Sequence, residues 1–426
     1  MPQSLDAWLD RIGRQHPQSI ALGLERVGEV AARLGLGRPA RRVVTVGGTN
    51  GKGSTVAFVE AIARAAGHRV GAYTSPHLLR YNERVRIDGA DVGDADLVAA
   101  FEAVEAARGD TPLTYFEYGT LAALWLFERA ELDLAVLEVG LGGRLDAVNL
   151  VDPDVAVITT VDLDHAEWLG EDREAVGAEK AGIIRAWKPV VLGERDPPSS
   201  VLRRAYALGA SAIRAQCDFF VDSDPDGGWR WREPGYEVAL PDPALAAPVQ
   251  RENAAAAIAA LRALDLALPD AALAAGLRAA VVPGRLQCVR HGDATFVLDV
   301  AHNPQAAREL ARWLAASADQ GAVRAVFAAL ADKDIAGILA PLAGQVVRWH
   351  LAGLGGDTPR GLDAASLRAR KVGVLPADAV ETAPDVATAL AAARATAAPG
   401  ERILVFGSFY TVAAALHALE AEVPSR

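Results

Sequence analysis

The sequence predicts two α/β domains, each built on a mostly parallel sheet with helices on both faces. The first observation is that short β-branched runs, such as 43–46, 134–139 and 155–161, alternate with longer apolar stretches of helical spacing. The second is the length of 426 residues, which is too long for one ordinary hydrophobic core. Alternating strands and helices indicate a doubly wound parallel sheet, whose ligands bind at the carboxyl ends of the strands. Polar segments follow these strands, so we expect the functional site at that edge.

Residues 1–284 are expected to form the N-terminal domain. Ser4 is placed to cap the first of two helices within residues 4–36. Residues 222–243 are rich in Pro, Gly, Asp and Trp, which predicts an irregular insert or a small hairpin. Further strands are expected at 70–73, 134–139 and 155–161, and helices at 97–107, from 114 onward and at 250–264.

A hinge is expected at residues 281–285, before a smaller C-terminal domain at 285–426. Its apolar runs again alternate between strand and helix spacing, which predicts a second, Rossmann-like α/β unit. The expected strands are 295–300, 325–329, 346–351 and 402–406.

The first polar segment is rich in glycine and lies between a predicted strand and a predicted helix. It comprises Gly48, Thr49, Asn50, Gly51, Lys52, Gly53, Ser54 and Thr55. Backbone N–H groups and the helix N-terminus at such a place bind phosphate, and Lys52 can reach the terminal phosphates of a nucleotide. The usual spacing is not kept, because Gly53 separates Lys52 from the hydroxyl residues. The alternative is a glycine turn with a solvated lysine, but the strand–loop–helix context favours a P-loop ATPase-type domain that binds ATP.

Composition excludes several classes of function. The net charge of −11 disfavours a nucleic-acid partner. Cys217 and Cys288 are far apart and indicate no disulfide framework, as in a reducing, cytoplasmic compartment. The sequence shows no signal peptide and no uninterrupted apolar run of about 18 residues, so no membrane partner is expected.

Three polar residues at strand ends are candidate metal ligands. Glu138 ends one buried strand, His165 follows another, and Ser75 follows a third. Carboxylate, imidazole and hydroxyl groups can bind Mg²⁺ when phosphate supplies the other ligands. The alternatives for Glu138 are a helix cap or a salt bridge with Arg144. The alternative for His165 is an exposed loop position.

Other candidates have plain structural alternatives. Lys180 ends a predicted helix, where a solvated lysine is favoured, and its residue context alone supports that interpretation. Asp299 and His302 follow a strand of the second domain, although Asn303 could simply cap the next helix and Asp299 be satisfied locally. Arg285 could bind phosphate or be a surface arginine.

Weaker signals come from an amide and a cationic segment. Asn253 on a predicted helix could contact an adenine edge. Arg80, Arg84 and Arg86 lie in a predicted loop and would ordinarily be a solvated run. In an acidic protein with a phosphate site, they could also attract an anionic substrate.

The assembled motifs resemble those of the folylpolyglutamate synthase family, of the bifunctional dihydrofolate synthase type, within the Mur ligase superfamily. The resemblance runs through nearly the whole chain and rests on eight segments in the same order, which is far more specific than any single one. These are residues 48–54, 74–78, 115–117, 137–146, 163–165, 179–183, 301–304 and 406–409. A departure is Tyr410, where many relatives are expected to have histidine.

The resemblance implies a role for each matching residue. It implies that Ser75, Glu138 and His165 bind magnesium and that Lys180 is carbamylated, against the solvated interpretation above. It also implies ATP contacts from Asn253, Arg285 and His302, and catalytic roles for Lys52, Lys180, His302 and Asp299. Arg80, Thr114, Phe116, Asp146 and Ala147 are implied to line the pterin or folate site, and Ser408 and Asp299 to lie near the glutamate.

The implied activity is ATP-dependent addition of L-glutamate to dihydropteroate and to tetrahydrofolate through an acyl phosphate. The implied cofactors are ATP and Mg²⁺, with room for a monovalent cation such as K⁺, and a monomer is expected. One rival is a Mur-type ligase for a cell-wall precursor, which the segment 114–118 disfavours. Another is a nucleotide-gated binding protein, which would not need so many convergent ligand candidates.

Overall fold

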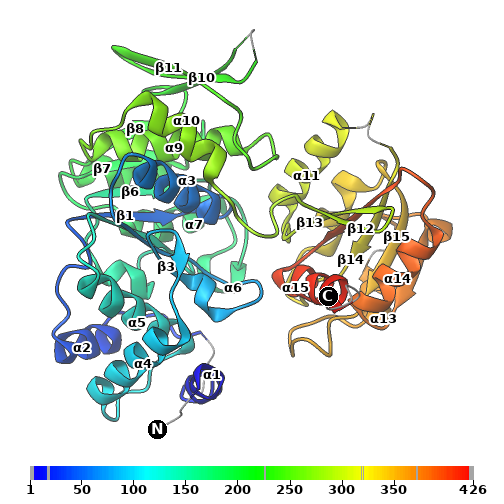
Figure 1. Ribbon diagram of the computed structural model, residues 1–426, viewed down its shortest axis with the longest axis horizontal. Coiled ribbons are helices and arrows are strands. Elements are labelled where there is room, and N and C mark those ends of the chain that lie inside the picture. Colours follow the sequence, from blue (N-terminus) through cyan, green and yellow to red (C-terminus); the bar gives the residue numbers. More distant parts are fainter. Residues whose placement is uncertain are drawn as a thin grey trace. The chain divides into compact units, whose positions relative to one another are not determined.

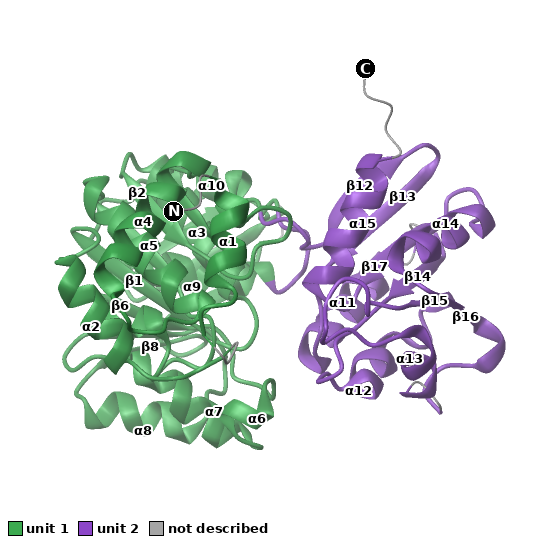
Figure 2. Cartoon of the chain, turned by 90° about the horizontal axis from the view of Figure 1, so that it is seen from below, with its two compact units in different colours: residues 1–244, 250–281 green, residues 245–249, 282–426 purple. Residues whose placement is uncertain are grey.

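The computed structural model describes residues 4–16, 20–224, 227–317, 319, 321–370 and 373–421. The chain divides into two compact units, of which the first is 1–244 with 250–281 and the second is 245–249 with 282–426 (Figure 2). The main part of the second unit therefore begins at residue 282 rather than at 285. The short segment 245–249, which was expected in the N-terminal domain, also belongs to the second unit.

The first unit is built on an eight-stranded sheet of order β4-β3-β2-β5-β1-β6-β7-β8. The pairs from β2 through β8 are parallel, whereas β3 and β4 are antiparallel additions at one edge. The strands are β1 (Arg42–Gly47), β2 (Val70–Tyr73), β3 (Val85–Ile87), β4 (Ala90–Asp91), β5 (Leu134–Glu138), β6 (Val155–Ile158), β7 (Pro189–Leu192) and β8 (Ser211–Arg214).

Helices cover both faces of this sheet. Figure 1 shows α3, α9 and α10 on one side of the sheet, and α2, α4 and α5 on the other. Val43, Ala135 and Leu137 belong to one apolar core with α1, α2, α4 and α5. The helices are α1 (Leu5–Ile12), α2 (Glu25–Leu34), α3 (Lys52–Ala65), α4 (Asp94–Arg108), α5 (Tyr115–Arg129), α6 (Ala166–Leu169), α7 (Arg173–Lys180), α8 (Ser199–Ala207), α9 (Gln250–Ala263) and α10 (Asp270–Ala279), with 3-10 turns η1 (Tyr81–Arg84), η2 (Ala147–Leu150) and η3 (Ala181–Ile183).

The predicted insert is a small antiparallel sheet of order β11-β10-β9. Its strands are β9 (Phe220–Ser223), β10 (Trp229–Glu233) and β11 (Tyr236–Leu240). Trp229 and Trp231 are fully buried, and the Trp231 indole donates to the Ala255 carbonyl at 3.2 Å. Trp231 therefore attaches this small sheet to α9.

The second unit has a six-stranded sheet of order β12-β13-β17-β14-β15-β16. Only the β12–β13 pair is antiparallel. Phe327 and Phe406 lie 4.8 Å apart in its core, beside Trp349. The elements are β12 (Gln287–His291), β13 (Ala294–Asp299), α11 (Pro304–Ala316), β14 (Val323–Phe327), α12 (Ile335–Leu339), η5 (Ala340–Leu342), β15 (Val346–Ala352), α13 (Ala364–Arg370), η6 (Ala377–Ala379), β16 (Val380–Ala383), α14 (Val386–Thr396), β17 (Arg402–Phe406) and α15 (Phe409–Ala421).

The predicted α/β class is confirmed in both units, and so is the Ser4 cap, which accepts from the Ala7 amide at 3.3 Å. The prediction of a loop across Arg80–Arg86 is wrong for its last two residues, because residues 85–87 form β3, which pairs with β2. No helix in the described part of the chain is both long and apolar enough to span a membrane.

Candidate active site

The glycine-rich loop joins β1 to α3 and needs glycine at two positions. Gly48 and Gly51 have φ values of 146° and 85°. A Cβ on Gly48 would lie 1.8 Å from Thr159 Oγ1, and one on Gly51 would lie 2.4 Å from Asn253 Oδ1. The loop is therefore packed tightly between the end of β6 and helix α9, which places Asn253 directly beside it.

Residues that follow β6 hold this loop in place. Thr49 N donates to Thr160 O at 2.7 Å, and the Thr49 hydroxyl bonds both the amide and the carbonyl of Asp162 at 3.0 Å. Thr159 Oγ1 donates to Asn50 O at 2.6 Å, and Asn50 N donates to Thr160 Oγ1 at 3.1 Å. The loop conformation is thus fixed by the protein alone. Sequence reasoning missed the two threonines because the strand predicted at 155–161 included them, whereas β6 ends at Ile158.

Lys52 begins α3 and turns back over the loop. Its ammonium donates to Gly48 O and Thr49 O, both at 3.1 Å. Ser54 and Thr55 are buried in the first turn, and the Thr55 hydroxyl has no hydrogen-bond partner among the described residues. A terminal phosphate would replace the two neutral carbonyl acceptors of Lys52 with anionic oxygens.

Two of the three candidate metal ligands lie together beside the loop. The buried Glu138 carboxylate accepts from Ser75 N at 3.2 Å. The carboxylate also lies close to the phosphate loop, since a Cβ on Gly53 would be 3.7 and 3.9 Å from the two carboxylate oxygens of Glu138. The alternative of a salt bridge between Glu138 and Arg144 is wrong, because Arg144 pairs instead with Glu179 at 2.8 Å.

The third candidate, His165, has a left-handed backbone with φ 52° and is half-buried. Its ring Nε2 lies 3.9 Å from Asp164 Oδ1. Within the described ranges, no group of three His, Cys, Asp or Glu side chains could hold a metal ion by itself. The oxygen donors at Ser75 and Glu138 suit magnesium, which commonly takes its other ligands from water and substrate phosphate.

Lys180 is buried, so its interpretation as a solvated lysine is wrong. Burial lowers the pKa of Lys180 to about 7, and the positive charge of Lys52 lowers it further, whereas Asp164 and Asp146 act in the opposite direction. A sizeable fraction of this amine is therefore neutral, and nucleophilic, at neutral pH.

The residues implied for the pterin site lie around the end of β5. The Asp146 carboxylate accepts from Leu141 N and Val148 N, both at 2.9 Å, and burial raises its pKa to about 7. The Phe116 ring lies against Gly140, where an added Cβ would be 2.6 Å away. Ala147 is buried at the start of η2.

Thr114 and Arg80 are already engaged within the protein. Thr114 caps α5, since its hydroxyl donates to Glu117 Oε2 at 2.9 Å and accepts from Glu117 N at 3.3 Å. Arg80 is exposed and lies 3.2 Å from Asp94. Of the three arginines in the cationic segment, Arg84 is buried and Arg86 is half-buried, so a solvated run is the wrong description of them.

Asp299, Arg285 and His302 cluster in the second unit. Asp299 accepts from Leu286 N at 2.9 Å and Ala301 N at 2.8 Å, and burial raises its pKa while nearby Arg285 lowers it. His302 Nδ1 lies 2.8 Å from Val300 O. The Arg285 guanidinium and the His302 ring lie 5.4 and 6.3 Å from the Phe409 ring.

Two further residues of this unit are helix caps. Asn303 accepts from Ala306 N at 2.9 Å, and the buried Ser408 accepts from Thr411 N at 3.0 Å. Tyr410, the departure from the family pattern, is exposed.

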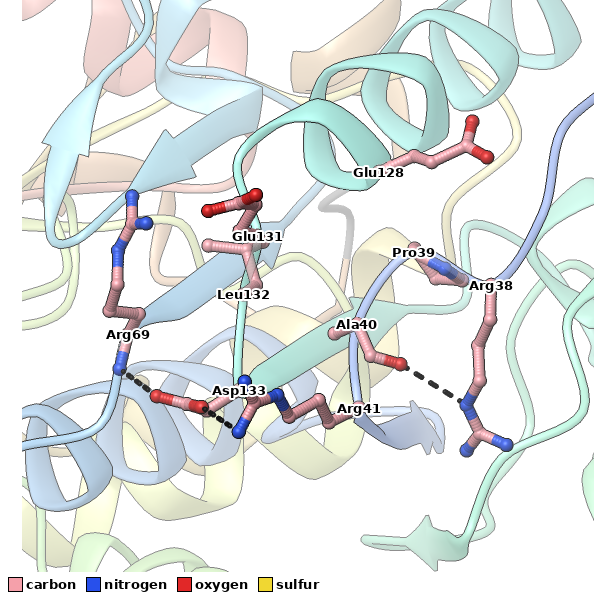
Figure 3. A pocket seen from close by; sticks show the side chains of 9 residues that line it. All are labelled: Arg38, Pro39, Ala40, Arg41, Arg69, Glu128, Glu131, Leu132 and Asp133. Carbon is pink, nitrogen blue, oxygen red and sulfur yellow. Dashed lines mark hydrogen bonds and ion pairs between the residues drawn. The ribbon is translucent and has the colours of Figure 1, made fainter.

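A separate hollow of about 640 Å³ lies at the amino ends of β1, β2 and β5 (Figure 3). It is lined by charged side chains that include Arg41, Arg69 and Asp133. Asp133 accepts from Arg69 N at 3.0 Å and lies 3.6 Å from Arg41. None of the predicted site residues lines it.

Comparisons with known proteins show the family to which the chain belongs. A family model described as Mur ligase middle domain matches residues 46–215, and one described as Mur ligase, glutamate ligase domain matches 284–409. The dihydrofolate synthase/folylpolyglutamate synthase of Escherichia coli (strain K12) is 47% identical over 418 residues, which are 98% of this chain and 96% of that protein. The protein of that name from Haemophilus influenzae is 38% identical over 96% of both chains.

Solved structures give the same result. E. coli FolC in complex with DHPP and ADP has a TM-score of 0.92 and 45% identity over 99% of both chains. The bifunctional enzyme of Yersinia pestis with AMPPNP and Mn has a TM-score of 0.90 and 48% identity, over 99% of this chain and 100% of that one. The resemblance read from the eight motifs is confirmed, and this chain belongs to the dihydrofolate synthase/folylpolyglutamate synthase family of Mur ligases.

Proposed function

We propose that this protein is an ATP-dependent ligase that adds L-glutamate to dihydropteroate, making dihydrofolate, and to tetrahydrofolates, making polyglutamates. The observation that carries the proposal is the preformed phosphate loop with Lys52, beside the buried pair of Glu138 and Ser75. The relatives that the chain matches over nearly its full length bear the names of these two activities.

The acceptor carboxylate attacks the γ-phosphate of ATP, which gives an acyl phosphate and ADP. The amine of L-glutamate then attacks the acyl carbon, and phosphate leaves. The first step brings like charges together, so stabilisation of charge dominates the catalysis. Lys52 and the loop amides offset that repulsion at the phosphates, and Arg285 is proposed to do so from the second unit.

Ser75, Glu138 and His165 are proposed to hold Mg²⁺, which would neutralise phosphate charge when it binds with ATP. Asn253 is proposed to contact the nucleotide, since it lies directly beside Gly51. His302 and Asp299 are proposed to orient the incoming amine, and Ser408 to lie near L-glutamate. Phe116, Asp146, Ala147, Thr114 and Arg80 are proposed to line the acceptor site.

Lys180 is proposed to be carbamylated. Its pKa of about 7 leaves enough neutral amine at physiological pH to add to CO₂. The N–C bond forms as the amine loses a proton, and the product is an anion in place of a cation. A negative group there would relieve the repulsion that Lys180 now meets from Lys52.

We also infer a reducing, cytoplasmic compartment and a monomer. Cys217 and Cys288 are both free and exposed, which supports a reducing environment.

ADP release by the purified protein with ATP, Mg²⁺ and L-glutamate tests the function. Turnover with both dihydropteroate and tetrahydrofolate supports the bifunctional proposal. Turnover with tetrahydrofolate alone would restrict it to polyglutamylation. Binding of ATP with no turnover on either acceptor would contradict it and would favour a cell-wall precursor as the substrate.

A further inference from the structure

Arg84 is a buried cation enclosed by aromatic rings. It ends η1, and the residue is only 8% exposed. Its guanidinium carbon lies 5.3 Å from the centre of the Tyr81 ring and 5.5 Å from that of Tyr115. These rings stabilise the charge through their negative faces, but they supply no hydrogen-bond acceptor in the plane of the guanidinium.

The hydrogen bonding of Arg84 is incomplete. Its Nε donates to His77 Nδ1 at 2.8 Å. Because His77 Nδ1 accepts this bond, it carries no proton, and the imidazole supplies one acceptor but no anion. Among the described residues, no carboxylate lies within 4.0 Å of the guanidinium, and no acceptor bonds its two terminal amino groups.

The charged residues next to Arg84 in the chain bond to other groups. Glu83, which directly precedes Arg84, accepts from the amides of Leu78, Leu79 and Arg80 at 2.6 to 2.7 Å. Arg86, two residues further on, is paired with the buried Glu60 at 2.8 Å. The two arginines on this segment therefore differ, since Arg86 has its anion inside the protein and Arg84 has none. A buried charge without an anion is costly, which suggests that a ligand supplies one.

Arg84 belongs to the candidate acceptor site. Its carbonyl accepts from Thr74 N at 2.9 Å, one residue before Ser75. Tyr115, whose ring lies 5.5 Å from the guanidinium carbon of Arg84, directly precedes Phe116 in the chain. The Tyr73 ring lies 6.0 Å from that of Phe116. The free amino groups are therefore near the residues proposed to bind the acceptor.

We propose that Arg84 binds the carboxylate of the acceptor that does not react, and so distinguishes folates from dihydropteroate. This inference rests on the proposed function. Dihydropteroate has a single carboxylate, which must go to the phosphate. A folate acceptor that reacts through its γ-carboxylate also carries an α-carboxylate, and a guanidinium binds such a group through two parallel hydrogen bonds.

The test compares KM values of Arg84→Gln and Arg84→Lys with those of the unchanged protein for both acceptors. In Arg84→Gln, we expect KM for tetrahydrofolate to rise about tenfold or more, as for loss of a charge-assisted pair. KM for dihydropteroate and ADP affinity should change little, and Arg84→Lys should be intermediate for tetrahydrofolate. The matched control is Arg203→Gln, an arginine of the same unit whose side chain is 74% exposed.

A second measurement does not depend on any variant folding correctly. A tetrahydrofolate whose α-carboxylate is converted to the carboxamide should lose affinity for the unchanged protein by a similar factor. It should show no further loss in Arg84→Gln, because the carboxylate and Arg84 then act as one interaction. Unchanged affinity of the unchanged protein for the carboxamide would overturn the proposal.

Other outcomes distinguish the alternatives. Equal losses with both acceptors would mean that Arg84 merely supports the loop, and a rise in KM for L-glutamate would assign it to the incoming amino acid. Either result overturns the proposal and leaves the ligase function standing. Absence of turnover by the unchanged protein with both acceptors would instead overturn the proposed function, and this inference with it.

Discussion

The two edges of the first sheet both carry many charged side chains, but they differ in whether those side chains have partners of opposite charge. At the amino edge, each arginine that lines the hollow has a carboxylate partner, namely Asp154 for Arg38, Asp133 for Arg41 and Asp88 for Arg69. At the carboxyl edge, Lys180 and Asp146 both have a pKa moved to about 7, and Arg84 has no carboxylate partner in the described part of the chain. Perturbed pKa values and a cation without an anion thus distinguish the proposed functional edge from the amino edge, where the hollow lies.

The largest effect is expected at Lys52. Lys52→Met removes the cation that is proposed to bind the terminal phosphates. Turnover should fall by about a thousandfold, which is typical for loss of a strong electrostatic contact in a transition state. ADP release under saturating substrates measures this, with thermal unfolding as the control for folding. Turnover within tenfold of the unchanged protein would mean that the loop amides alone stabilise the phosphates.

The second prediction concerns carbamylation of Lys180, and it tests whether a residue with a perturbed pKa has a functional role. With ¹³C-bicarbonate, we expect a carbamate signal by NMR that is absent in Lys180→Arg. Because the pKa of Lys180 is lowered to about 7, the neutral amine increases as the pH rises through 7, so the signal should be weak at pH 6 and strong at pH 8. A signal of equal strength in Lys180→Arg would assign the carbamate to another amine.

A smaller effect, on stability rather than chemistry, is expected at the buried pair of Glu60 and Arg86. Glu60→Gln leaves Arg86 without its anion and should lower the free energy of unfolding by about 3 kcal/mol. Chemical denaturation measures the loss. Glu237→Gln is the matched control, because its 61% exposed carboxylate pairs with an exposed Arg230, and it should not change stability measurably.

The smallest effect is expected at the amino edge. Arg41 is 84% exposed and lies 3.6 Å from Asp133. Arg41→Gln should leave both turnover and stability unchanged within error, because exposed pairs contribute little. A clear loss of turnover would show that the hollow takes part in function, and it would break the comparison between the two edges.

Strand–helix alternation and strand-end motifs were sufficient to predict the α/β class and to indicate the carboxyl edge. The antiparallel edge strand β3 was missed because three residues with two β-branched side chains give too short a periodic signal. The burial of Lys180 was missed for a different reason. Its helix has an ordinary C-terminal lysine pattern, and the charged residues that act on it, such as Lys52 and Asp146, come from other segments of the chain. The lack of an ion-pair partner for Arg84 could not be predicted either, because the partners of a buried arginine come from segments that are distant in the sequence.

The bonds that join Thr49 and Asn50 to residues 159–162 have a thermodynamic consequence. A flexible glycine loop loses conformational entropy when it closes on a ligand, at about 1 kcal/mol or more per residue. Here part of that entropy is lost when the protein folds, since hydrogen bonds within the protein join the loop to the residues after β6. Nucleotide binding to this loop should therefore be governed by charge and sensitive to ionic strength, with little contribution from ordering of the backbone.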